Sequence, residues 1–555
     1  MRKRFWWLAI VVAVLLVAGL SASAQESVVE GIEGSFIAEQ AAPVIEEAEW
    51  LDEVPVLTNE QLIQVAAGTK RANRPGPAID RGSEATLPTD AAPEASLGLL
   101  GQELAPTSEG APAAPGDPQL YRKTTFGGTI PSGYKSNVME SSTAQNGKFA
   151  FFSGNWFGAR STNGGVNWQY RSSFTGFADF CCDQVVLYNP AYDMFLWYRQ
   201  GVPNASGVNR LLLSVSTNGG NTFCTYQTFP TNTNSGWTNQ WWDYPHLQMG
   251  ADYLYIATNM FNASDNWTRT VMLRWPLDKL ATCAGFNYSY TSTNTWFTWV
   301  PVQNADHVMY CASNYPTSSP YNRVRIWTWR EDSSSVNTST TLTVPVWNYT
   351  GRGQAVCGSS TNNWAARLDD RMLTGARYML HTTDVKIPGR TVLGWWWNVK
   401  AGLGFSQPYA NGVAVYENTM GLLSGAQGRP FMRDNSTCIL YPSVAANGRG
   451  DLGVVFNVGA GSNKVPAVAY LIQDDYAPAI PSGTYYTIQT SGARPSDRRW
   501  GDYNTVRPMS PVQTNWVAAA HYIPGSSACS ACSAPVFFNF GRARDAKAWN
   551  YWQNK

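Results

Sequence analysis

The sequence predicts an all-β fold in which similar sheets close into a ring, a β-propeller, with seven blades expected and six as the alternative. Strand-like runs alternate with turns rich in Gly, Asn, Ser and Pro from residue 121 onward, without a helix-period stretch. The composition, with 24 Trp, 27 Tyr, 22 Phe and 48 Gly, suits strands joined by tight turns. Acidic strand starts recur about every 60 to 70 residues, the length of one four-stranded blade with long loops.

The first 24 residues have the layout of a secretory signal peptide. Met1 to Arg4 are basic, residues 5–20 are apolar, and the small residues Ala22 to Ala24 predict cleavage before Gln25. An uncleaved anchor is the alternative, because the apolar run approaches the length that spans a bilayer. We therefore expect a secreted, soluble monomer with no membrane span after cleavage.

Residues 25–120 differ in composition from the rest of the chain. They are rich in Ala, Glu and Pro and contain a single tryptophan, Trp50. Such a segment buries too little apolar area to offset its chain entropy, so we expect a disordered leader or pro-segment, with a short helix near Asn59–Ala67. The predicted division is a signal peptide (1–24), a leader (25–120), a propeller (121–545) and a C-terminal tail (546–555).

The ring is expected to close by sharing one blade between the two ends of the domain. After Asp502 only three good strands follow, the last of them at residues 536–540. A fourth strand from residues 120–123 would complete this blade and remove an open sheet edge.

Nine cysteines follow the signal peptide, so at least one stays unpaired within a monomer from an oxidising compartment. Cys529 and Cys532 are expected to form a local disulfide in a surface loop. Cys181 and Cys182 are neighbours, and a bridge between them would be strained. We therefore expect one of them to pair elsewhere, with Cys224 as a candidate.

Charge and motif content exclude several function classes. The net charge is +1, charged residues make up 14% of the chain, and no basic cluster follows the first four residues. Nucleic acid is therefore excluded as a partner, since phosphate binding needs clustered Lys and Arg. The chain also lacks the HExxH metalloprotease, GxSxG hydrolase and phosphate-loop motifs.

One polar turn occurs twice, as STNGGVNW at residues 161–168 and STNGGNTF at residues 216–223. It resembles the Asp-box, or BNR repeat, of the sialidase superfamily, Ser-x-Asp-x-Gly-x-Thr-Trp/Phe. The matching positions are Ser161 and Ser216, Gly165 and Gly220, and Trp168 and Phe223. Asn163 and Asn218 replace the Asp of the family and can likewise accept backbone N–H groups in a turn.

This resemblance implies a sialidase-like propeller in which the box is a structural hairpin at the blade periphery, and it does not imply a reaction. Sialidases proper also carry an Arg-Ile-Pro motif whose Arg binds the substrate carboxylate. Here Thr129 precedes Ile130 and Pro131. The chain is therefore similar to a divergent secreted relative and not to a typical sialidase.

The recurring acidic residues are expected to meet at one face of the ring, where the innermost strands begin. They are Asp183, Asp243, Asp306, Asp370 and Asp502. Two of these carboxylates could act as acid and as base or nucleophile in glycoside hydrolysis. Alternatively, the group could bind Ca²⁺, or each Asp could cap its own strand locally.

Our first hypothesis is a carbohydrate-active protein that hydrolyses an extracellular glycan. Its catalytic candidates are the carboxylates of Asp183, Asp243 and Asp502, assisted by Arg371 and Tyr503. A polysaccharide lyase is a further alternative, because His, Tyr and Arg can neutralise a uronate and abstract its proton. The remaining candidates, for substrate binding, are Tyr244, His246, His307, Asp306 and Asp370.

A non-catalytic propeller that binds a glycan or a cell-surface protein is the competing class. Three consecutive tryptophans, Trp395 to Trp397, are candidates for binding a sugar. Neighbours in a strand point to opposite sides, so we expect some of them to face outward. An exposed indole would offer a stacking platform for a sugar ring.

Overall fold

The computed structural model describes residues 31–71, 99–103, 113–136, 139–316, 322–347, 355–358, 363–381, 390–460, 464–478, 483–528 and 532–555. The expected signal peptide lies outside these residues. Within them, no helix is both long enough and apolar enough to cross a membrane.

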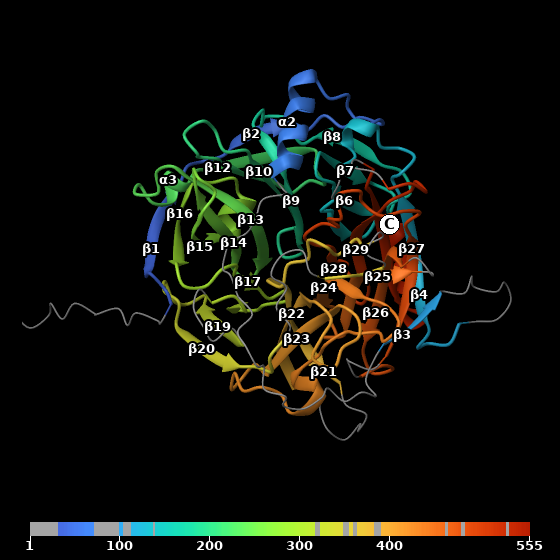
Figure 1. Ribbon diagram of the computed structural model, residues 1–555. Helices are drawn as coiled ribbons and strands as arrows, with labels where there is room; N and C mark the ends of the chain where they lie inside the picture. The colour runs from blue at the N-terminus through green and yellow to red at the C-terminus, as the bar shows by residue number, and fades with distance from the viewer. Residues whose placement is uncertain are drawn as a thin grey trace, which may run out of the picture.

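Seven sheets surround a central axis and form a seven-bladed β-propeller (Figure 1). The seven innermost strands contact one another in sequence around the ring, and the last contacts the first. They are β5 (Ser142–Asn146), β9 (Phe180–Asn189), β13 (Gln240–Met249), β17 (Val300–Pro301), β21 (Met372–Leu380), β24 (Ile439–Ala446) and β28 (Thr505–Pro508). The prediction of seven blades is confirmed.

The other strands follow outward within each antiparallel blade. Blade 1 adds β6 (Phe149–Ser153), β7 (Phe157–Ser161) and β8 (Gln169–Ser172); blade 2 adds β10 (Met194–Gly201), β11 (Leu211–Ser216) and β12 (Thr222–Thr228); blade 3 adds β14 (Tyr253–Asn262), β15 (Trp267–Pro276) and β16 (Phe286–Thr293). Blade 4 adds β18 (Val308–Ser313), β19 (Arg323–Arg330) and β20 (Thr338–Thr343); blade 5 adds β22 (Arg390–Val399) and β23 (Tyr409–Tyr416); blade 6 adds β25 (Leu452–Ala460), β26 (Val465–Gln473) and β27 (Gly483–Thr490).

Blade 7 closes the ring as the sequence predicted. It consists of β28, β29 (Trp516–Tyr522), β30 (Ala534–Arg542) and, on the outside, β4 (Pro118–Thr125) from the start of the propeller. Phe538 of β30 pairs with Lys123 of β4. The two ends of the domain are thereby hydrogen-bonded into one sheet, which leaves no gap in the ring.

Short helices connect or cover the strands. They are α2 (Asn59–Arg71), α3 (Pro230–Thr233), α4 (Leu277–Ala281) and α5 (Ala546–Gln553), with 3₁₀ turns η1 (Ser132–Tyr134), η2 (Gly425–Gly428) and η3 (Ala543–Asp545). The helix expected near residues 59–67 is α2. The predicted C-terminal tail contains α5, whose Trp549 stacks on Tyr121 of β4 with ring centroids 5.2 Å apart.

The described part of the leader is ordered, contrary to the expectation of disorder. β1 (Ser35–Gln40) pairs with β16, β2 (Val44–Glu47) with β12, and β3 (Leu99–Glu103) with β27. Composition misled the prediction because these strands bury little apolar surface: Val44 keeps 72% of its surface exposed. The open outer edges of three blades supply backbone hydrogen bonds instead.

The consecutive tryptophans Trp395, Trp396 and Trp397 are all fully buried, so the expected sugar platform does not exist there. They lie on β22, the middle strand of blade 5. Trp395 and Trp397 belong to a core cluster shared with blade 4, whereas Trp396 belongs to one shared with blade 6. Both faces of a blade pack against neighbours, so a side chain on either face of the sheet is buried.

The disulfides correct one expectation about the cysteines. Cys181 is bonded to its neighbour Cys182, and Cys224 is bonded to Cys283. Cys224 could not have reached Cys181, because β12 and β9 are three strands apart in blade 2, about 14 Å.

Five further cysteines remain. Cys357 pairs with Cys438, and among the described cysteines the buried Cys311 is free. Cys532 is disulfide-bonded, and Cys529 lies outside the described residues.

The repeated polar turns join the third and fourth strands of blades 1 and 2. In the second copy, the Ser216 hydroxyl accepts the Gly220 N–H at 2.9 Å and the Asn218 side-chain oxygen accepts the Thr222 N–H at 3.0 Å. Gly219 and Gly220 have φ of 68° and 81°, which favours glycine, and Phe223 closes the turn in the core. The turn is structural, and Asn replaces Asp without losing the acceptor.

The hydrogen bonds of this turn predict the effect of changing Asn218. Asn218→Ala removes the acceptor for the Thr222 N–H and is expected to lower the free energy of unfolding by about 1 kcal/mol. Asn218→Asp keeps an acceptor oxygen and is expected to stay within about 0.5 kcal/mol of the parent. Urea unfolding followed by tryptophan fluorescence measures both. Equal destabilisation by the two variants would contradict the role of the acceptor.

Candidate active site at the central face

The innermost strands run in the same direction, so their starts meet at one face of the ring, called here the central face. Charged residues gather at these strand starts. We call the following seven residues the central cluster: Glu140 before β5, Asp183 in β9, Asp243 in β13, Asp369 and Arg371 before β21, and Arg499 and Asp502 before β28.

A left-handed residue opens the innermost strand in several blades. Cys182, Tyr244, Thr298 and Tyr441 have φ between 56° and 60°. The pairing register shifts at two of these positions, between Asp243 and His246 and between Leu440 and Ser443. Such bulges twist a strand and change where the adjoining side chains point. They place these strand starts at the axis.

Asparagines tie each of these strand starts to the preceding blade. In four blades, a buried Asn accepts the backbone N–H of the next blade's strand start. The pairs are Asn209 with Trp242 at 2.7 Å, Asn259 with Thr298 at 3.1 Å, Asn314 with Met372 at 2.9 Å and Asn398 with Tyr441 at 2.7 Å. Contacts between blades therefore hold the strand starts of blades 3 to 6, and with them the segments that carry Asp243 and Arg371.

Carboxylates and guanidinium groups alternate through the central cluster. One oxygen of Asp502 lies 2.9 Å from Arg499 and 3.3 Å from Arg371. Arg499 also lies 3.5 Å from Glu140, and Arg371 lies 3.5 Å from Asp369. Both guanidinium groups are therefore engaged by carboxylates of the protein.

Tyr244 lies against Arg371, whose guanidinium carbon is 3.4 Å from the centroid of the phenol ring. This is a close cation–π contact in a largely buried setting. The ring of His246 meets that of Tyr244 edge-on, with centroids 5.0 Å apart. Within the described part of the chain, the Tyr244 hydroxyl and His246 Nε2 have no hydrogen-bond partner. Burial lowers the pKa of His246 to about 3, so this imidazole is neutral.

Glu140 and Asp183, called here the acid pair, are neighbouring buried carboxyls, and each affects the pKa of the other. Burial, and then the charge of Asp502, raise the pKa of Glu140 to about 7. Burial, and then the charge of Glu140, raise the pKa of Asp183 well above its ordinary value. Adjacent buried carboxyls cannot both ionise cheaply, so this pair retains a proton at neutral pH.

Asp243 has a different environment from Asp183. Its Oδ1 accepts hydrogen bonds from the Gln200 side chain at 3.0 Å and from the Tyr244 N–H at 2.9 Å. Burial raises the pKa of Asp243, whereas these two hydrogen bonds and Arg371 lower it. The pKa of Asp243 is therefore raised less than that of Asp183.

Tyr503 lies beside the acid pair and over a small axial cavity. Its hydroxyl donates to the carbonyl of Gln184 at 3.3 Å, and burial raises the pKa of the phenol well above its ordinary value. The cavity has a volume of about 60 Å³, and its lining includes His246, Tyr503, Thr505 and Arg507. It has room for a few water molecules.

The structure brings together most of the residues that the sequence selected. Asp183, Asp243, Asp502, Arg371, Tyr244 and Tyr503 interact around the central cluster, and His246 adjoins it. Three residues lie elsewhere, namely Asp306, His307 and Asp370.

Asp306 and His307 lie at the opposite face of the ring, because they follow the innermost strand of blade 4 instead of preceding it. The prediction for Asp306 and His307 was wrong because it used the number of residues between acidic positions. That number depends on the lengths of the loops as well as on the lengths of the strands. Asp370 is buried between blades 4 and 5, and its carboxylate accepts the Trp347 indole N–H at 3.1 Å. Its neighbour Asp369 joins the central cluster instead.

Glu140, Arg499 and Asp369 were missed by the sequence analysis. Glu140 immediately precedes the first innermost strand, in phase with the other acidic residues, but it is a Glu in a series of Asp. Arg499 lies three residues before Asp502 in a loop without strand periodicity. Only its position opposite Glu140 in the folded ring reveals its role.

The cluster fits acid–base chemistry better than it fits a calcium ion. Two guanidinium groups already occupy the space among the carboxylates where Ca²⁺ would neutralise them. The alternative that each Asp caps its own strand is confirmed for two residues, because Asp243 and Asp369 accept backbone N–H groups of nearby residues. Most contacts nonetheless cross between blades, which capping does not require.

The acid pair predicts how stability depends on pH. A carboxyl whose pKa is higher in the folded state stabilises the fold at low pH and loses that contribution as pH rises. For Glu140 the loss runs from about pH 4.5 to about 7 and amounts to roughly 3 kcal/mol. We expect the free energy of unfolding to fall between pH 5 and 8 in the parent and to fall less in Glu140→Gln.

Asp332→Asn is the matched control for this measurement. Asp332 is fully exposed, and its hydrogen bond with Arg330 lowers its pKa, so it is ionised throughout this range. Urea midpoints at several pH values should show the parent's slope in this control. An unchanged slope in Glu140→Gln would contradict a proton held by the acid pair.

No family model matches the chain, and no curated protein matches its sequence. Solved structures match at low identity. The NanB sialidase of Streptococcus pneumoniae is 9% identical over 62% of this chain and 67% of its own, with a TM-score of 0.37. An α-L-arabinofuranosidase of Fusarium graminearum is 9% identical over 76% of this chain and 98% of its own, with a TM-score of 0.32. The sialidase of Trypanosoma rangeli is 9% identical over 67% of this chain and 54% of its own, with a TM-score of 0.29. These three proteins are similar to this chain at low identity only, and its seven-bladed propeller is established by its own sheets.

Proposed function

We propose that this protein is a secreted glycoside hydrolase that cleaves an uncharged extracellular glycan at the central face. The observation that carries the proposal is the different environments of two neighbouring buried carboxyls. Burial and the charge of Glu140 raise the pKa of Asp183 well above its ordinary value, whereas hydrogen bonds from Gln200 and Tyr244 oppose the rise at Asp243. Glycosidases need such a pair, one carboxyl to give a proton and one carboxylate to attack or to activate water.

Asp183 is the proposed general acid. It gives the proton of the acid pair to the glycosidic oxygen as the bond to the anomeric carbon breaks, which leaves Asp183 and Glu140 both ionised beside Arg499 until a proton returns. Asp243 is the proposed base or nucleophile on the other side of the sugar. A water molecule completes the reaction and adds its hydroxyl to the anomeric carbon. Its proton goes to Asp183 where Asp243 is the nucleophile, and to Asp243 where Asp243 is the base.

The remaining cluster residues hold this arrangement in place. Asp502 binds both guanidinium groups and so keeps Arg371 against Tyr244. Tyr503 lies close enough to the acid pair for the charges of Asp183 and Glu140 to raise the pKa of its phenol. These contacts are positioning roles that act through the two reacting carboxyls.

The charge balance favours an uncharged substrate. Arg371 and Arg499 are engaged by protein carboxylates, so neither is available to bind a sialate or a uronate. The carboxyls of the central cluster also outnumber its guanidinium groups, which repels an anion. The same reasoning weighs against a polysaccharide lyase, which must neutralise a uronate before it abstracts a proton.

Activity assays on variants of the two carboxyls test the proposal. Asp183→Asn and Asp243→Asn are each expected to lower the rate of glycan cleavage by ~10³-fold. Asp306→Asn, at the opposite face, should leave the rate unchanged. Purified protein is incubated with a panel of neutral and acidic polysaccharides, and new reducing ends and unsaturated products are measured separately.

The outcomes separate three function classes. Reducing ends without unsaturated products, lost in both central variants, support hydrolysis. Unsaturated products would identify a lyase and overturn the proposal. Binding of a glycan without cleavage, unaffected by Asp183→Asn, would identify a non-catalytic propeller.

A further inference from the structure

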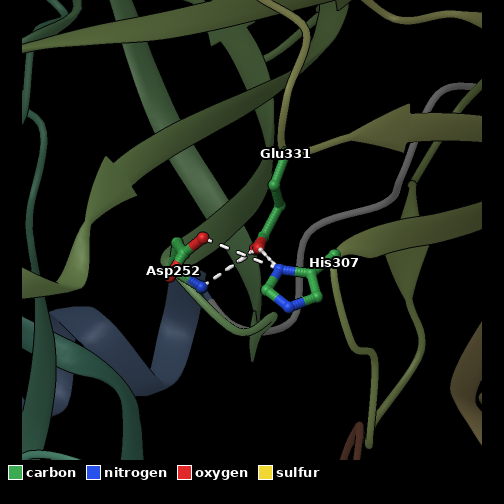
Figure 2. A group of neighbouring side chains, drawn as sticks. All are labelled: Asp252, His307 and Glu331. Carbon is green, nitrogen blue, oxygen red and sulfur yellow. Dashed lines mark hydrogen bonds and ion pairs between the residues drawn. The ribbon is translucent and has the colours of Figure 1, made fainter.

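A second group of ionisable side chains lies at the far face of the ring, where the innermost strands end. It consists of Asp252 between β13 and β14, His307 just before β18, and Glu331 just after β19 (Figure 2). One donor atom from each residue lies within 4.8 Å of the others. Blades 3 and 4 thus contribute to the same point of the surface.

We propose that Asp252, His307 and Glu331 form a zinc site that joins blades 3 and 4. An imidazole nitrogen with two carboxylate oxygens is a donor set that Zn²⁺ binds, whereas Ca²⁺ and Mg²⁺ prefer oxygen ligands alone. Three protein ligands leave a fourth tetrahedral position open to water.

The distances agree with tetrahedral coordination. Zn–N and Zn–O bonds of about 2.0–2.1 Å place neighbouring ligand atoms about 3.3–3.4 Å apart. His307 Nδ1 lies 3.3 Å from Glu331 Oε2 and 3.6 Å from Asp252 Oδ2. Figure 2 shows the same ring nitrogen directed at both carboxylates.

A further carboxylate lies near the other nitrogen of His307. The distance from His307 Nε2 to a carboxylate oxygen of Asp306 is 3.8 Å, which is too long for a hydrogen bond. At this distance the charge of Asp306 favours a proton on Nε2, which leaves Nδ1 to face the metal. Asp306 would therefore act at the far face, and not in substrate binding at the central face as its position in the repeat had suggested.

The backbone holds the ligand segments together without any metal. The Glu331 N–H donates to the His307 carbonyl at 2.9 Å, and the Ala251 N–H donates to the Asp306 carbonyl at 3.2 Å. Gly250 leaves room for Glu331, because a Cβ there would lie 2.2 Å from its Oε1. The site is therefore preorganised, which lowers the entropic cost of binding.

The charges of this group call for a cation. The Glu331 side chain is only 3% exposed and its carboxylate lies near that of Asp252. The Asp252 backbone N–H donates to both carboxylate oxygens of Glu331, at 3.3 and 3.1 Å, and holds this carboxylate in place beside the imidazole. Among the described residues, no Lys or Arg forms an ion pair with either carboxylate. A divalent ion would neutralise both.

Zinc titration of the whole protein, prepared without an affinity tag and stripped with EDTA, tests the proposal. Isothermal titration with ZnSO₄ should show one saturable site per chain. His307→Ala should weaken its affinity more than ~100-fold, and Asp306→Asn, which removes the charge near Nε2, should weaken it by roughly 10–100-fold. Excess Ca²⁺ or Mg²⁺ should not compete.

His381→Ala is the matched control. His381 Nε2 also contacts a carboxylate, Asp451, at 2.9 Å, but Arg449 and Arg544 already neutralise that carboxylate. This variant should bind zinc like the parent. Asp252→Asn changes an exposed loop residue and should weaken binding without affecting the melting temperature of the metal-free protein. Absence of a saturable site, or equal zinc affinity in His307→Ala and the parent, would overturn the proposal.

Discussion

The central face depends on the neutralisation of buried charge. Isolated carboxylates cannot be buried cheaply, so each member of the central cluster needs a partner. These partners come from different blades: Glu140 from the first, Arg371 from the fifth, and Arg499 and Asp502 from the seventh. The cluster can form only when the ring has closed through β4, and the closed ring in turn buries the charges that must be paired.

This constraint also accounts for the proton that the site retains. Two guanidinium groups cannot neutralise five carboxyls, so burial leaves Glu140 and Asp183 with raised pKa values. A buried carboxyl that holds its proton at neutral pH lowers the free energy of unfolding when it ionises. The protonated carboxyl is, however, the form that a general acid requires. The hydrogen bonds from asparagines to the next blade hold these strand starts at the axis, although burying the carboxyls there lowers stability.

The sequence predicted the residues of this site only where an acidic residue of the repeat lies at the start of an innermost strand. Asp183 and Asp243 were predictable because each lies at the start of an innermost strand. Asp306 was not, because β17 spans only Val300–Pro301 and the acidic residue comes after the strand. Arg499 lies in an irregular loop, and its partner Glu140 is 359 residues away, so no local pattern joins them. The leader strands were missed because edge pairing is not visible in composition.

The carboxyls at the two faces of the ring have different partners, and these partners favour different chemistry. At the central face the carboxyls meet guanidinium groups and one another, and proton sharing follows. At the far face an imidazole is the only side chain that forms an ion pair with Asp252 or Glu331 among the described residues, which suits a metal ion. The innermost strand β13 runs from Gln240 to Met249 between these faces and separates them by roughly 25–30 Å. Such a distance keeps the two sets of charges independent, so a metal at the far face would fasten blades 3 and 4 without altering the protonation of the central cluster.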